Sequence, residues 1–242
     1  ASKHAISSHP PPPDPAGDHP DSISARLRAP RAAAIAGIVF SLLLIASAVL
    51  LRLSVPADPL EAGAWLQHHA GRVALALNLV PFAGIAFLWF IGVLRDRLGE
   101  REDRFFATVF FGSGLLFLAM LFVAAAMIGA IIIVFLAHPE RLLGTASFTL
   151  ARAIAYEIMN IYAIRMAAVF MIATSTLALR TGFIARRNAF LGYALALLLL
   201  LSSRYVEGIV VVFPLWVLLV SVQILISNLH APPQASDSTS QR

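Results

Sequence analysis

Residues 105–137 read FFATVFFGSGLLFLAMLFVAAAMIGAIIIVFLA, and this stretch decides the fold because it contains no charged side chain. As an α-helix rising 1.5 Å per residue, it would be about 50 Å long. The hydrocarbon core of a bilayer is about 30 Å thick, and about 20 apolar residues cross it. The stretch therefore predicts a membrane-spanning helix that tilts or protrudes.

The composition of the whole chain agrees with this prediction. Of the 242 residues, 59% are hydrophobic and 13% are charged, and the mean hydropathy is +0.82. A soluble domain carries about 25% charged residues. We therefore expect an all-α fold, an integral membrane helical bundle whose surface contacts the lipid bilayer.

Apolar runs before and after this stretch predict about six transmembrane helices, at residues 32–51, 73–94, 105–137, 151–179, 188–201 and 206–228. Together they form one membrane domain, residues 31–229. The proline-rich segment 1–30 and the polar segment 230–242 cannot bury enough apolar surface to fold, so both are expected to be disordered tails. Pro81 falls inside the second predicted span, where it should kink the helix.

Arginines near the ends of the spans predict the topology. One side of the membrane, which holds both termini, would carry Arg26, Arg28, Arg31, Arg95, Arg97, Arg101, Arg104, Arg180, Arg186 and Arg187, and the other Arg52, Arg72, Arg141, Arg152 and Arg204. Because cytoplasmic loops are enriched in basic residues, both termini are expected in the cytoplasm and the protein in a plasma membrane. The same placement accounts for the net charge of +5, so no nucleic-acid partner is expected. The preference for arginine over lysine indicates a GC-rich bacterial genome.

Arg165 is the strongest functional clue, since an always-charged guanidinium inside an apolar span needs a partner or a watery cavity. On a helical wheel Glu157, Asn160 and Arg165 fall within about half the circumference, an arc expected to face protein or water. The fifth apolar run, residues 189–201, is only about 20 Å long. If the turn that follows it dips below the membrane surface, Arg204 and Glu207 would approach the same cluster.

This cluster has two interpretations. It could bind or translocate a polar or anionic molecule, or it could be a buried network that fixes helix register, with an arginine that extends to the headgroups. We expect no cofactor, no metal site and no catalytic residue. The chain has no cysteine, and its seven histidines all fall outside the predicted spans, so axial ligands for a haem are missing.

The run FLWFIGVLRDR at residues 87–97, continued by EDRFF at residues 102–106, resembles uncharacterised multi-pass membrane proteins of actinobacteria. The resemblance covers the second and third spans best and implies no activity. Three functions stay open. The first is a non-catalytic accessory or scaffold subunit of a membrane complex, with a membrane protein partner or as a homo-oligomer. The others are a small transporter or channel-like protein using Arg165 and Glu157, and a lipid-modifying membrane enzyme.

Overall fold

The computed structural model describes residues 20–56, 58, 60, 63, 65–98, 104–182, 185–201 and 208–229. Within these ranges the chain is almost entirely helical and has no strand, which confirms the predicted all-helical fold. Five of the described helices are long and apolar enough to cross a membrane: Arg31–Ser54, Leu66–Arg95, Phe105–Ala137, Ala146–Thr181 and Ile209–Ser227. This is the pattern of a multi-pass membrane protein.

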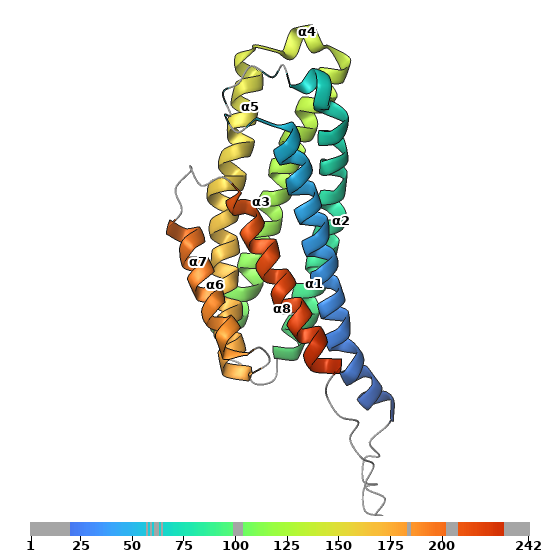
Figure 1. Cartoon of the computed structure of the whole chain (residues 1–242), viewed down its shortest axis with the longest axis vertical. Coiled ribbons are helices and arrows are strands. Elements are labelled where there is room, and N and C mark those ends of the chain that lie inside the picture. The colour runs from blue at the N-terminus through green and yellow to red at the C-terminus, as the bar shows by residue number, and fades with distance from the viewer. Residues whose placement is uncertain are drawn as a thin grey trace, which may run out of the picture.

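The helices form an elongated bundle (Figure 1). In chain order they are α1 (Pro20–Ser54), α2 (Leu66–Leu98), α3 (Arg104–Ala137), α4 (Pro139–Leu142), α5 (Ala146–Glu157), the π-helix η1 (Ile158–Ala163), α6 (Ile164–Thr181), α7 (Arg186–Leu201), the 3₁₀-helix η2 (Ile209–Val211) and α8 (Val212–Leu229). Figure 1 shows α1, α2, α3 and the continuous unit α5–η1–α6 running along the bundle, whereas α7 and α8 accompany only one half of it. The start of α1 and the end of α8 lie at the same end.

Several helices begin before the predicted spans. α1 starts at Pro20, inside the segment expected to be a tail, and proline is well tolerated at a first helical position. α5 starts at Ala146 because the side chain of Thr145 caps it, accepting a hydrogen bond from Phe148 N at 3.2 Å. Gly182, at φ 72°, ends α6 in the left-handed conformation that glycine adopts without strain.

α7 corresponds to the predicted fifth span but is short. It has 16 residues, so it is about 24 Å long, less than the thickness of a hydrocarbon core. It packs on α6, where the hydroxyls of Thr176 and Tyr193 lie 2.6 Å apart in a hydrogen bond. Gly192 permits this approach, because a Cβ there would meet Ser175 of α6 and Trp216 of α8.

The main core lies in the half of the bundle that holds all the long helices together with α7. Its centre is Phe87 of α2, fully buried, whose ring centroid lies 4.6–5.9 Å from rings on α1, α3, α6 and α8, namely Phe40, Phe117, Phe170 and Phe213. Aromatic rings at such distances attract one another beyond simple area burial. Phe87 therefore ties four neighbouring helices to α2.

A second, smaller core lies at the other end, around α4 and the start of α5. Its buried members are Leu66, Val73, Ile131, Ile132, Phe135, Leu142 and Phe148. These residues come from α2, α3, α4 and α5, so neither α7 nor α8 contributes to this end of the molecule.

Candidate functional site

Arg165 lies near the start of α6 and its side chain is exposed on the flank of the bundle. Among the described residues its guanidinium makes one hydrogen bond, from Nη1 to the carbonyl oxygen of Ile161 at 3.4 Å. One turn earlier Tyr162 is 58% exposed. The charge therefore sits on an outward-facing surface of the isolated chain and not in the packed interior.

The π-helix η1 changes how the predicted polar residues relate to Arg165. In an uninterrupted α-helix Glu157 and Arg165, eight positions apart, would be offset by about 80° around the axis. η1 spans Ile158–Ala163 between them. A π-turn accommodates one extra residue, which reduces the offset to about 20°. Glu157 and Arg165 thus lie in one row along the helix, about 10 Å apart along its axis.

The other members of the predicted cluster behave differently. Glu157 and Asn160 are half-buried, and Asn160 Nδ2 donates to the carbonyl of Tyr156 at 3.0 Å, within its own helix. Arg204 and Glu207 lie outside the described residues, so their approach to this row stays a prediction. α7 ends at Leu201, and its length matches the rise from the end of α6 back to about Arg165.

Pro81 lies inside α2, which is described as one helix from Leu66 to Leu98. Its ring nitrogen cannot donate a hydrogen bond, so one carbonyl of the preceding turn loses its usual partner. Pro81 is exposed on the bundle surface. The predicted kink at this position stays a prediction.

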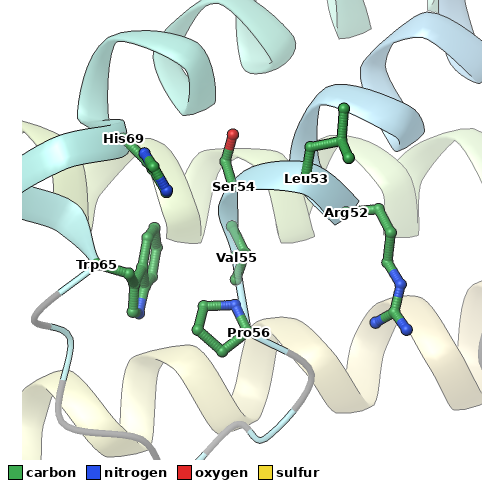
Figure 2. Close-up of a pocket in the computed structure, with 7 residues that line it drawn as sticks. All are labelled: Arg52, Leu53, Ser54, Val55, Pro56, Trp65 and His69. Atoms are coloured by element: carbon green, nitrogen blue, oxygen red, sulfur yellow. The ribbon is translucent and has the colours of Figure 1, made fainter.

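A second polar site lies at the end of the bundle where α1 finishes and α2 starts. Seven residues line a pocket of about 240 Å³ there: Arg52, Leu53, Ser54, Val55, Pro56, Trp65 and His69. In Figure 2 Trp65 and His69 lie on one side of it and Arg52 on the other, with the chain from Ser54 to Pro56 between them. The predicted spans stop short of this region, so sequence reasoning missed the pocket.

Arg152 of α5 holds two walls of this pocket in place. Its side chain is 4% exposed, and its Nη2 donates to the carbonyl oxygen of Pro56 at 2.8 Å. Its guanidinium carbon also lies 5.3 Å from the centre of the Trp65 ring, a cation–π distance. Helix α5 thereby anchors the connection between α1 and α2.

Three polar atoms on the pocket walls are buried without a hydrogen-bond partner: Ser54 Oγ, Trp65 Nε1 and His69 Nδ1. Buried polar atoms in native proteins are normally paired, so an unpaired group calls for an explanation. All three atoms have almost no solvent-accessible surface, so they are buried within the walls of the pocket, and four further unpaired atoms lie elsewhere among the described residues.

The described residues offer no group of three or more histidine, cysteine, aspartate or glutamate side chains that could hold a metal ion. His138 and Glu140 form a close pair at 4.0 Å at the exposed start of α4. Comparison of the chain with protein-family models, with curated proteins and with solved structures finds no match in any of the three.

Proposed function

We propose that this protein is a six-span bacterial plasma-membrane protein, with both termini in the cytoplasm, that acts as a non-catalytic subunit or scaffold of a membrane complex. In this proposal α7 also crosses the membrane, as the fifth of the six spans. A transmembrane helix of the partner, or of a second copy, covers the row formed by Glu157 and Arg165. The observation that carries the proposal is the exposed guanidinium of Arg165 on the flank of an apolar bundle.

The energetic argument follows from the depth of Arg165. Counting the hydrocarbon part of the helix back from Arg180 places Arg165 about 7 Å from the middle of the membrane. Insertion scales assign a cost of about 2.5–3.5 kcal/mol to an arginine at a helix centre. An acidic or polar side chain on a partner helix would remove that cost, and ion pairs inside a membrane generally mark an interface or a pathway.

The surface around Arg165 suits a helical partner. Tyr162 is exposed in the same region, and the exposed large hydrophobic side chains of α5 are Leu150 and Ile154. The exposed guanidinium of Arg165 would give a partner helix one fixed positive group to meet. That group helps to set the register of the partner, because a shifted helix would lose the contact.

A transporter with a polar site around Arg165 and Glu157 is the second candidate, and the π-helix η1 favours it, since π-turns occur frequently at functional sites. In that case the cluster would face a path for a polar or anionic substrate. Mutation of the cluster would then abolish transport, but the purified protein would keep the same subunit composition.

Purification in a gentle detergent from the native membrane, followed by mass spectrometry, tests the proposal. The wild-type chain should come with a stoichiometric membrane partner or as an oligomer. Arg165→Leu should lose that association while remaining folded and inserted, and Arg180→Leu, at the end of the same helix, should keep it. A monomeric wild-type protein without any partner would refute the subunit proposal, as would an association unaffected by Arg165→Leu.

A further inference from the structure

Arg165 also indicates what kind of partner the bundle has, an inference that rests on the function proposed above. Its side chain is exposed, and its one hydrogen bond among the described residues, to the carbonyl of Ile161, is long at 3.4 Å. A guanidinium carries five N–H donors in a planar fork. Most of these donors therefore have no partner in the part of the chain that the structure describes.

A carboxylate is the side-chain group that satisfies this fork best. One carboxylate accepts two parallel N–H···O bonds from a guanidinium, and such charge-assisted bonds are roughly twice as strong as neutral ones. A serine or an asparagine on a partner helix would accept a hydrogen bond but would leave the charge uncompensated. Because an arginine charge is costly inside a membrane, an acidic side chain offers Arg165 the larger gain.

The phosphates of lipid headgroups are further from Arg165 than a neighbouring helix is. Arg165 lies about 7 Å from the middle of a hydrocarbon core about 30 Å thick, so the nearer headgroup boundary is about 8 Å beyond its level. A phosphate would therefore require a fully extended side chain. A carboxylate on an adjacent helix meets the guanidinium at its own depth.

Glu157 is the only acidic residue in the five long apolar helices and in α7, as far as the structure describes them. It is half-buried and already takes part in an interaction within the chain. It lies about 10 Å along the axis from Arg165, and because Cβ atoms point toward the N-terminus of a helix, its side chain leans away from Arg165. The described helices thus hold no carboxylate at the level of Arg165.

The described helices of a second copy do not supply this carboxylate either. Copies that insert in the same direction hold each residue at the same depth, so Arg165 of one copy meets only the Arg165 level of the next. In a two-fold dimer through this surface the two Arg165 side chains would face each other, because such an interface pairs the same patch on both subunits. Two like charges in contact oppose association.

We propose that the partner at this surface is a different protein, which presents an aspartate or a glutamate on a transmembrane helix at the depth of Arg165. Tyr162 supports the contact, since it is 58% exposed and lies three positions before Arg165, where helical side chains are neighbours. Tyrosine and arginine are both enriched at the centres of protein interfaces.

Photo-crosslinking of the full-length chain in its native membrane identifies what covers this surface. Tyr162→p-benzoylphenylalanine places the photoreactive group beside Arg165, and the same replacement of Phe82, 64% exposed on α2, is the matched control. Mass spectrometry of the adduct should give an apolar helical peptide from a different membrane protein, with an aspartate or glutamate within about two turns of the cross-linked residue. The control at Phe82 should not capture that peptide.

Substitutions at Arg165 test the charge. Arg165→Gln should weaken the association at least about tenfold, whereas Arg165→Lys, which keeps the charge but not the planar fork, should weaken it less. Neutralising the acid found in the cross-linked peptide should cost as much as Arg165→Gln, and the two changes together should cost less than their sum. Glu207→Gln, a change outside the described residues, should leave the association unchanged.

Several results overturn this inference and leave the subunit function standing. They are an adduct with a second copy of the chain, an adduct with lipid alone in a complex that still co-purifies, and a partner peptide without an acid. An association that survives Arg165→Gln has the same effect, and so does an equal loss in Glu207→Gln, which would place the carboxylate in this chain. A wild-type chain that gives no adduct and purifies as a monomer refutes the subunit function itself.

Discussion

Replacement of Phe87 by alanine should be among the most damaging single changes in this bundle. Its ring is fully buried and meets four other rings, Phe40, Phe117, Phe170 and Phe213. In a lipid environment the transfer of apolar surface contributes little to helix association, so packing dominates. Four aromatic pairs at about 0.5–1.5 kcal/mol each sum to about 2–6 kcal/mol. Because such terms are not additive, we expect a loss of about 2–4 kcal/mol.

The loss can be measured by titrating the purified protein with sodium dodecyl sulfate in mixed micelles and following near-ultraviolet circular dichroism. Trp89→Ala is the matched control, since Trp89 lies two positions along the same helix and is 65% exposed. It should change stability by less than about 0.5 kcal/mol. If Phe87→Ala unfolds at the wild-type detergent fraction, or if both variants are equally destabilised, the four-helix aromatic core is not what holds this half of the bundle together.

Three other substitutions test individual contacts by the same titration. Tyr193→Phe removes the 2.6 Å hydrogen bond to Thr176 and should cost about 0.6 kcal/mol. Thr176→Val removes this bond and also the bond from Thr176 Oγ1 to the Ile172 carbonyl, so the double variant should lose less than the sum of the two single losses, and fully additive losses would contradict the contact. Thr145→Ala removes the cap on Phe148 N and should cost about 1 kcal/mol, with faster hydrogen exchange in the first turn of α5; unchanged exchange there would argue against the cap. Arg152→Gln removes a buried charge-assisted hydrogen bond and should cost about 1.5–3 kcal/mol, with altered tryptophan fluorescence; a spectrum identical to the wild type would contradict the cation–π contact.

The helical fold could be predicted from the sequence because long apolar runs have few alternatives. The run at residues 105–137 agrees with α3, Arg104–Ala137, almost residue by residue. Helix starts were harder to predict, since a helix can continue into polar sequence once it has formed. α2 begins at Leu66 and α5 at Ala146, and both starts depend on local turns and caps that hydropathy does not record.

The candidate sites were predictable to different degrees. Arg165 stood out because its charge conflicts with its apolar surroundings. Its alignment with Glu157 could not be predicted, because it depends on the π-helix η1, whereas a helical wheel assumes a constant 100° per residue. The pocket could not be predicted, because Arg152 is 96 positions from Pro56 in the chain and meets it only through the packing of α5 against the connection between α1 and α2. Arg152 was expected at the end of a span, and nothing in the sequence indicates that its side chain is buried.

The division of the bundle into a large and a small core has a consequence for its dynamics. The end that contains the pocket is closed by α1, α2, α3 and α5 without support from α7 or α8, so it buries fewer side chains. Regions with few buried contacts open at a lower free energy than the whole molecule does. We therefore expect this end to open at a lower free energy than the phenylalanine-rich half, and its backbone amides to exchange hydrogen faster.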